Sequence, residues 1–327
     1  MNNSIITKTV AILNQGGLII FPTDTAYGLG CRLDNPQALQ KINKITKRLS
    51  TMPSPVLVSS LKMAQKFLQK TSPAFIKLTQ KFWPGPLTLI YKCQIHKVHP
   101  LVRGQGSTLG VRQPNHPIVL KIIQKIGVPI LGTSANLHGH STPFEKKDLN
   151  PKILKHVDLI LGGNCPLKES STVLDLSQTP WQVLRRGSIK VVLVTGCFDI
   201  LHSEHQKFLQ KSKEQGHILI VGVEPNSRVQ KLKGSKRPIN KDQIRIKNLK
   251  KLELADHIFI LPQDFGQEKK RLSLLKKINP DILAISSKDP FLKIKKNLCQ
   301  KTNICLKIVL PYNPKVSTTK ILSPLTK

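Results

Sequence analysis

Acidic residues are scarce in this sequence. Asp and Glu together number 18 against 52 Lys and Arg, so the formal net charge is +34. A field of that sign attracts polyanions, including tRNA, rRNA and nucleotides. The lysines are spread along both halves of the chain rather than gathered in one tail, which is also the pattern of ordinary solvated faces. The charge therefore leaves two interpretations open: a lysine-rich composition inherited from an AT-rich genome, or contact with RNA.

Paired cysteines and long apolar runs are also missing. The six cysteines are scattered and form no Cys-x-x-Cys pair, which argues against a zinc ribbon and against a disulfide framework. No run approaches the roughly 18 apolar residues that a membrane-spanning helix needs. The start, Met1-Asn2-Asn3-Ser4, lacks the features of a secretion signal. These absences predict a reduced, cytoplasmic protein with no resident metal and no membrane partner.

The length of 327 residues favours two domains, each large enough to bury its own core. Strand-like and helix-like segments alternate along the chain, and the alternation is more regular after Val191. Such alternation is typical of parallel strands with crossover helices. We expect an α/β protein with a twisted open α/β sheet in residues 1–188 and a Rossmann-like doubly wound parallel sheet in residues 189–327. In the first half the expected helices include 37–48, 61–82 and 117–126.

Six motifs follow one another in the first half. They are Phe21-Pro22-Thr23-Asp24-Thr25-Ala26-Tyr27-Gly28-Leu29-Gly30, Trp83-Pro84-Gly85-Pro86-Leu87-Thr88, Gly110-Val111-Arg112-Gln113-Pro114-Asn115-His116-Pro117, Thr133-Ser134-Ala135-Asn136, Ser171-Thr172-Val173 and Leu184-Arg185-Arg186-Gly187. Singly, most of them indicate only a turn with local hydrogen bonds. Together and in this order, over about residues 5–188, they resemble the YrdC/Sua5 family of threonylcarbamoyl-AMP synthases.

That resemblance implies an enzyme that joins L-threonine, bicarbonate and ATP into threonylcarbamoyl-adenylate and diphosphate, with Mg²⁺ offsetting phosphate charge. The product supplies the tRNA-modifying transferase machinery that acts on adenosine 37. The resemblance implies Thr25 and Ser171 as hydroxyl contacts to threonine. It implies Arg112 as a catalytic residue and as the partner of the threonine carboxylate, for which a planar guanidinium is suited. For ATP it implies Ser134, Asn136 and Arg185.

One position departs from the family pattern in the first half. The family has Lys-x-Arg after its first helix, where this chain has Thr46-Lys47-Arg48. Arg48 keeps its place and is expected to act in catalysis and nucleotide binding. A lysine ammonium on a flexible stem tolerates a shift better than a guanidinium does, so Lys47 is the expected substitute on the phosphates.

The second half opens on Thr195-Gly196-Cys197-Phe198-Asp199-Ile200-Leu201-His202-Ser203-Glu204-His205, after a buried strand and before a helix. With Lys233-Gly234-Ser235-Lys236-Arg237-Pro238 and Val316-Ser317-Thr318-Thr319, it resembles the cytidylyltransferase-like family over about 190–323. That family includes glycerol-3-phosphate cytidylyltransferase and the nucleotidyl-transferring domain of ADP-heptose synthesis. Its members transfer a nucleotidyl group from CTP or ATP to a phosphorylated sugar or polyol.

For the second half, the resemblance implies His202 and His205 as catalytic residues on the triphosphate. Backbone N–H groups at a helix start favour such an anion, and imidazoles steady the charge that builds during transfer. Further nucleotide contacts are expected from two glycine-turn residues, two basic residues and a helix start: Gly196, Phe198, Lys233, Arg237, Ser317, Thr318 and Thr319. Arg245 is a further candidate cation.

Glu204 departs from the family signature, which has glycine between the two histidines. A carboxylate there repels phosphate and fills the space that glycine leaves open. The sequence therefore allows three functions: a synthase fused to a nucleotidylyltransferase-like domain, a protein whose main role lies in the second domain, or a basic RNA-binding protein on a retired synthase fold.

Overall fold

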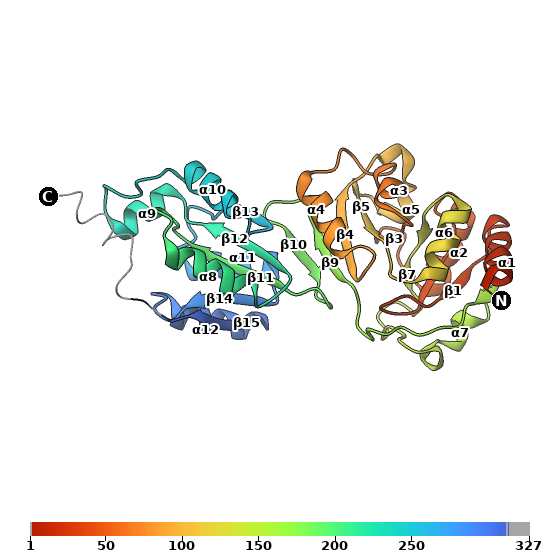
Figure 1. Cartoon of the computed structure of the whole chain (residues 1–327). Helices are drawn as coiled ribbons and strands as arrows, with labels where there is room; N and C mark the ends of the chain where they lie inside the picture. Colours follow the sequence, from red (N-terminus) through yellow and green to blue (C-terminus); the bar gives the residue numbers. More distant parts are fainter. Residues whose placement is uncertain (1, 312, 314–327) are drawn as a thin grey trace. The chain divides into compact units, whose positions relative to one another are not determined.

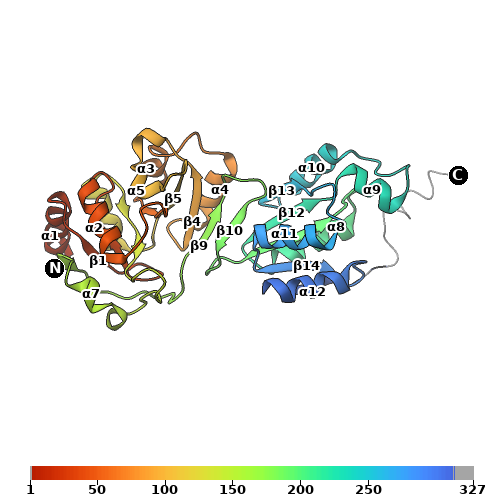
Figure 2. The same cartoon turned by 180° about the vertical axis from the view of Figure 1, so that it is seen from behind.

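The computed structural model describes residues 2–311 and residue 313. They form two compact units (Figures 1 and 2). The first contains the chain up to Ser177 together with Arg185–Ser188, and the second contains Gln178–Leu184 together with the chain from Ile189. Helices and strands alternate in both, which confirms the α/β class.

The first unit has short strands joined by helices. Its elements in chain order are α1 (Asn2–Asn14), β1 (Ile19–Phe21), β2 (Gly28–Gly30), α2 (Pro36–Thr46), β3 (Val56–Leu57), α3 (Leu61–Gln65), α4 (Pro73–Phe82), β4 (Leu87–Lys92), η1 (Ile95–Lys97), α5 (Pro100–Arg103), β5 (Thr108–Arg112), α6 (Pro117–Ile126), β6 (Ile130–Leu131), β7 (Thr133–Ser134), η2 (Lys146–Asp148), α7 (Pro151–Leu154), β8 (Leu159–Ile160), β9 (Thr172–Asp175) and β10 (Gln182–Arg185), the last of which contains a change of unit.

Two sheets carry these strands. One has the order β7-β2-β1-β8, and the other has the order β10-β9-β4-β5-β3-β6. Both mix parallel and antiparallel pairs: β1 is antiparallel to β2 but parallel to β8, and β4 is antiparallel to β5 but parallel to β9. Helices α1 and α6 pack beside β1, because Ile6, Leu13, Ile19, Phe21 and Ile122 share one buried cluster.

The prediction of one continuous helix over 61–82 is wrong. The structure has α3 and α4 there, separated by a loop. Ser72 caps α4 by accepting a hydrogen bond from the Phe75 N–H at 3.2 Å, and Pro73 occupies the first helical position. Proline has no N–H to continue a preceding helix but fits the first turn of a new one, so the chain must restart there. The helix predicted over 117–126 is confirmed at those bounds.

The second unit is one parallel sheet with long strands. Its elements are β11 (Val191–Gly196), α8 (Ser203–Lys213), β12 (Ile218–Val223), α9 (Asn226–Lys233), α10 (Asp242–Lys251), β13 (His257–Ile260), α11 (Glu268–Ile278), β14 (Ile282–Ser286), α12 (Leu292–Thr302) and β15 (Cys305–Leu310).

The strand order β13-β12-β11-β14-β15 makes β11 the centre of this sheet, and every pair in it is parallel. Helices α8 and α11 cover opposite faces, as the two opposite views show (Figures 1 and 2). Val192 and Val194 pack with residues of α8 and α10, whereas Leu193 and Thr195 line a cavity beside α11 and α12. This confirms the doubly wound parallel sheet, in which ligands bind at the carboxyl ends of the strands where the strand order reverses. Among the residues described, no helix is long and apolar enough to cross a membrane.

Gly30 supplies a test of the packing between strands in the first unit. A Cβ atom at this position in β2 would run into the carbonyl oxygen of Leu131, whereas a Cβ at Gly110 would meet its nearest atom, Cβ of Pro55, at 3.4 Å. We expect Gly30→Ala to lower the free energy of unfolding by about 1–3 kcal/mol, since backbone cannot move aside cheaply, and Gly110→Ala to change it by less than about 1 kcal/mol. Urea denaturation measures both. Equal losses in the two variants would contradict this account.

Candidate functional site

A buried polar cluster forms where the loop after β1 meets the end of β5 in the first unit. The Arg112 guanidinium donates to the Thr25 hydroxyl at 2.7 Å and to the Gly85 carbonyl at 3.0 Å. It also forms an ion pair with the Asp24 carboxylate, which accepts a further hydrogen bond from the Asn115 N–H at 3.0 Å. The Thr25 hydroxyl lies 3.0 Å from that of Thr23. Thus Thr25 and Arg112, predicted from different motifs, lie in direct contact.

Asp24 is the residue of this cluster that the sequence reasoning missed. Both ionic side chains are almost fully buried, at 5% exposed for Asp24 and 7% for Arg112. Burial lowers the pKa of Arg112, and the nearby Asp24 charge opposes that effect. Removing one partner of such a pair costs about 3–5 kcal/mol, because the other charge stays buried and uncompensated. Arg112 is therefore not a bare cation but one already matched by a carboxylate.

Ser171 and Arg185 form the second part of the cluster. Arg185 donates to the Ser171 carbonyl at 3.0 Å and to its hydroxyl at 2.8 Å, and that hydroxyl lies 2.9 Å from the Thr88 hydroxyl. Burial lowers the pKa of Arg185, and the positive charge of Arg112 lowers it further. Two guanidinium groups and two hydroxyls from four predicted positions thus converge in one region.

The two residues implied for ATP lie at the end of β7 and just after it, beside β2. Ser134 pairs with Gly28, and Ala135 N–H donates to the Tyr27 carbonyl at 3.0 Å. The Asn136 amide nitrogen donates to the carbonyls of Leu137 and His140, at 3.0 and 2.7 Å. The Asn136 side-chain oxygen is buried and accepts no hydrogen bond from the described residues. That oxygen is available to a ligand.

The Thr46-Lys47-Arg48 stretch ends α2. The Thr46 hydroxyl donates to the Ile42 carbonyl of its own helix at 2.7 Å, and its side chain is buried. Lys47 is exposed and adopts the left-handed conformation that closes the helix. Arg48 donates to the Pro53 carbonyl at 2.5 Å, and burial lowers its pKa. Within residues 2–311, no hydrogen bond joins Arg48 to the Arg112 cluster.

The glycine turn of the second unit joins β11 to α8. A Cβ at Gly196 would lie 2.8 Å from the ring of Phe198, which itself has φ +50, a conformation that costs a bulky side chain energy. His202 immediately precedes α8, and its ring stacks on that of His205 with centroids 3.9 Å apart. The Nδ1 atoms of both rings are buried and lack a hydrogen-bond partner among the described residues. This turn therefore brings the two imidazoles into direct contact.

Burial lowers the pKa of His205 to about 4, with the charges of His202 and Lys233 adding to the effect. The pKa of His202 is lowered for the same first reason, although Glu204 opposes it. At neutral pH both rings are therefore uncharged. Neutral imidazoles offer one donor and one acceptor each, so they can bind phosphate oxygens without a proton uptake step.

Of the basic residues predicted nearby, Arg237 and Arg245 bond to other residues of the chain. Arg237 pairs with the Asp199 carboxylate at 3.2 Å. Arg245 is fully buried and donates to the carbonyls of Asn240 and Cys197 and to the Asn226 side chain, at 3.0, 2.7 and 2.9 Å. Arg245 thus fixes the loops around the turn rather than presenting a charge to a substrate. Lys233 is exposed at the end of α9 and acts electrostatically on both histidines.

Glu204 lies in the first turn of α8 and pairs with Lys207 at 3.1 Å. Hydrogen bonds from Lys207 and, to a smaller degree, from Asn313 lower its pKa. The carboxylate is therefore charged and engaged beside the two histidines. Ser317, Thr318 and Thr319 lie outside the described residues.

Comparisons with known proteins find a matching family model for each half of the chain. The Sua5/YciO/YrdC family model, described as "Telomere recombination", matches residues 11–187, and the "Cytidylyltransferase-like" model matches residues 193–322. A Bacillus subtilis protein named threonylcarbamoyl-AMP synthase is 33% identical over 192 residues, which are 58% of this chain and 55% of that protein. The chain thus spans little more than half the length of that relative.

Two solved structures resemble the fold. Escherichia coli YciO has a TM-score of 0.53 and 27% identity, covering 57% of this chain and 91% of its own. Sua5 of Pyrococcus abyssi, solved in complex with L-threonine, has a TM-score of 0.52 and 20% identity, covering 94% of this chain and 96% of its own. At that identity the second likeness concerns the fold alone.

The low pKa of His205 makes a prediction about acid stability. Between pH 6.5 and about 4 the unfolded chain binds a proton at this ring that the folded chain does not, so acidification should lower the free energy of unfolding. The contribution is at most about 1.4 kcal/mol per pH unit. We expect His205→Asn to flatten this dependence in urea denaturation measured across that range. His257, whose pKa burial also lowers to about 4, serves as a positive control in His257→Asn. Identical slopes in wild type and His205→Asn would contradict the assignment.

Proposed function

Because the chain belongs to the Sua5/YciO/YrdC family, we propose that its first domain, residues 1–188, is a threonylcarbamoyl-AMP synthase. It joins L-threonine, bicarbonate and ATP into L-threonylcarbamoyladenylate and diphosphate. The adenylate supplies the transferase machinery that acts on adenosine 37 of tRNA. The observation that carries this proposal is the convergence of Thr25, Arg112, Ser171 and Arg185 in one buried polar cluster. The name of the Bacillus subtilis relative supports it.

The reaction has two bond-forming steps. The threonine nitrogen bonds to the carbon of bicarbonate and water leaves, giving a carbamate. A carbamate oxygen then bonds to the α-phosphorus of ATP, the bond to the bridging oxygen breaks, and diphosphate leaves. Negative charge is concentrated at the substrate carboxylate and at the leaving phosphates, so positioned guanidinium groups lower the barrier.

Each arginine has a distinct task in this proposal. The hydrogen bonds to Gly85, Thr25 and Asp24 use three of the five N–H groups of Arg112, and the remaining ones can bind the threonine carboxylate. Asp24 fixes the guanidinium plane for that contact. Arg185 is fixed by Ser171 and faces the phosphates. Ser134, at the end of β7, and Asn136, just after it, bind the nucleotide.

Mg²⁺ enters this reaction with ATP as part of the substrate. Among the described residues, no group of three or more His, Cys, Asp or Glu could hold a metal ion. Mg²⁺ is commonly bound through substrate phosphates and only one or two carboxylates, so its binding with ATP does not require a group of three such side chains.

For the second domain, residues 189–327, we propose nucleotidyl transfer from CTP or ATP to a phosphorylated sugar or polyol. Support comes from the match to the cytidylyltransferase-like family and from two neutral imidazoles with unpartnered, buried Nδ1 atoms at the start of α8. His202 and His205 bind the triphosphate, and Lys233 adds positive charge beside them. Glu204 weakens nucleotide binding through its charge and its volume.

Diphosphate release from ATP tests the first domain. We expect the purified chain to release diphosphate only when both L-threonine and bicarbonate are present. Ser171→Ala removes a hydroxyl that binds Arg185, a charge-assisted hydrogen bond of about 1.5–3 kcal/mol, and should lower kcat/KM roughly ten- to a hundredfold. Ser177→Ala, which removes a buried hydroxyl without a partner among the described residues, is the matched control. Release that ignores threonine would refute the synthase. RNA affinity that falls steeply with salt, without such release, would favour the RNA-binding alternative.

Calorimetric titration with CTP and with ATP tests Glu204. Glu204→Gln removes the charge, and Glu204→Gly also removes the volume, so nucleotide affinity should rise in the first and rise further in the second. Glu214→Gln is the control, since Glu214 pairs with Lys211 at 2.9 Å at the other end of α8. Unchanged binding in both Glu204 variants would contradict this effect of Glu204, and weaker binding would mean that Glu204 takes part in the site.

A further inference from the structure

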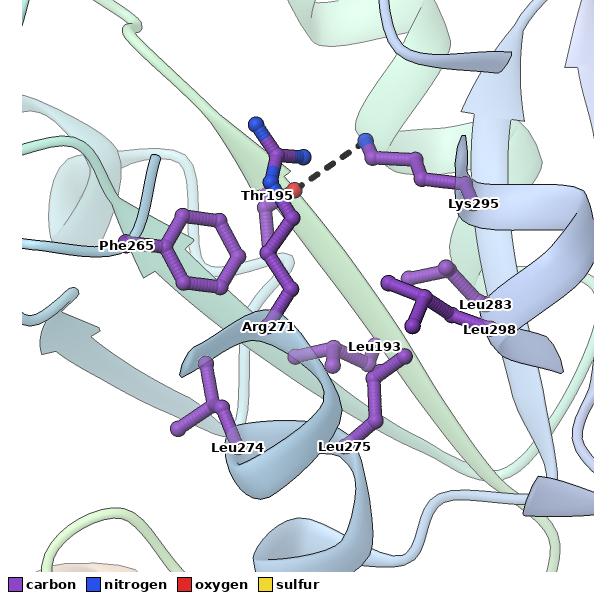
Figure 3. Close-up of a pocket in the computed structure, with 9 residues that line it drawn as sticks. All are labelled: Leu193, Thr195, Phe265, Arg271, Leu274, Leu275, Leu283, Lys295 and Leu298. Atoms are coloured by element: carbon purple, nitrogen blue, oxygen red, sulfur yellow. Dashed lines mark hydrogen bonds between the residues drawn. The ribbon is translucent and has the colours of Figure 1, made fainter. Parts of the chain in front are cut away.

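Helices α11 and α12 cover one face of the sheet in the second unit, opposite α8 (Figure 2). An ion pair between Lys301 of α12 and Glu268 of α11, at 3.4 Å, joins the two helices. Their inward sides line the cavity beside β11, with Leu274 and Leu275 from α11 and Leu298 from α12 (Figure 3). Because both helices pack on the same face of the sheet, their outward sides point the same way.

The outward sides of these two helices carry lysines without partners. Lys270 pairs with Asp264 at 2.9 Å, and Lys301 pairs with Glu268, which is the only acidic residue in either helix. Five other lysines are exposed and form no ion pair or hydrogen bond with any residue that the structure describes. We call them the α11–α12 surface: Lys269, Lys276, Lys277, Lys293 and Lys296.

Two lysines of the α11–α12 surface lie where a helix disfavours positive charge. Lys269 is in the first turn of α11, and Lys293 is in the first turn of α12. The first turn of a helix carries partial positive charge, so it repels both ammonium groups. Lys293 and Lys296, three residues apart, also repel each other across one turn. These positions do not stabilise the helices, and a ligand with negative charge would relieve the repulsion.

The composition of the surface favours a double-helical phosphate backbone over other polyanions. Among the described residues of α11 and α12, Ile294 is the one large hydrophobic side chain exposed, at 37%, and neither helix contains an aromatic residue. A helix that lies on a membrane needs a broad apolar face, and proteins that bind single strands stack the bases on aromatic side chains. Lys269 and Lys276, seven residues apart, lie on one side of α11 at a spacing of about 10 Å. Several lysines can therefore contact phosphates of one rigid duplex together.

We propose that the α11–α12 surface binds the phosphate backbone of double-helical nucleic acid. Helical RNA, such as the stems of tRNA, and duplex DNA share this chemistry. Ammonium groups on phosphates supply affinity and position the nucleic acid but read no sequence. This binding involves neither the Arg112 cluster nor the histidine turn, and it is independent of both activities proposed above.

Fluorescence anisotropy of labelled unfractionated tRNA and of a labelled DNA duplex, titrated with the full chain at several salt concentrations, tests the proposal. Lys269→Gln/Lys293→Gln should weaken binding about tenfold at about 0.15 M salt and reduce the slope of log affinity against log salt by about two. Lys247→Gln/Lys251→Gln is the matched control. It removes the same charge from α10, which packs on the other face of the sheet and where both lysines are exposed. The control should change affinity and slope much less.

Lys269→Gln/Lys293→Gln removes unfavourable charge from two helix starts, so its Tm should be unchanged or higher, and unfolding then does not explain weaker binding. Lys269→Arg/Lys293→Arg keeps the charge and should bind like the wild type. Selective loss of either nucleic acid supports the proposal, and the tighter ligand identifies the source. Equal weakening in the α10 control would overturn it, because binding would then follow total charge. So would loss of binding to phosphatidylserine vesicles in Lys269→Gln/Lys293→Gln while both nucleic acids still bind.

Discussion

Burial of the Arg112 guanidinium is the constraint on which the first site depends. A charge that is almost fully removed from water must be matched by acceptors at fixed positions, and here they come from two separate stretches: Asp24 and Thr25 after β1, and Gly85 after α4. Each contact joins segments far apart in the sequence. The loop after β1 can therefore adopt few conformations, and its hydroxyls are placed before any substrate arrives. Preorganisation of this kind reduces the free energy spent on ordering during binding.

The same physical rule operates in the second unit with a different solution. Arg245 is also fully buried, but its partners are two backbone carbonyls and the side chain of Asn226. These acceptors are neutral, so they satisfy the hydrogen bonds of Arg245 but do not balance its positive charge. The Asp199 carboxylate nearby accepts from the N–H groups of Ile239 and Asn240, which fixes the loop before α10 against the glycine turn. In this basic chain, some arginines therefore connect buried segments through hydrogen bonds, in addition to those that carry surface charge.

The motifs predicted the fold class and the residues that meet in the first cluster, because each motif combines a strand end with a chemically distinctive side chain. They could not reveal Asp24 as the partner of Arg112, since that pairing spans 88 residues and depends on how β1 and β5 are placed. The break at Ser72-Pro73 was readable in principle, as serine and proline are strong helix-start signals. The buried charges Arg228, Arg271 and Lys295, which lie with Glu224 and Asp289 in the second unit, had no sequence signal at all: they come from α9, α11, α12 and two loops, and only the fold brings them together. Thr46 shows a further limit, because a substitution recognised in the sequence becomes intelligible only once its hydroxyl is found bonded to its own helix.

The chain changes unit three times, after Ser177, after Leu184 and after Ser188. Gln178–Leu184 lie within the stretch that matches the first family, yet they belong to the second unit, where Trp181 is buried and stacks on His257 with centroids 4.4 Å apart. A single cut in the polypeptide can therefore not yield both units whole. Cleavage after Ser188 would separate Trp181 from the residues it packs against, and cleavage after Ser177 would separate Arg185 from the first site.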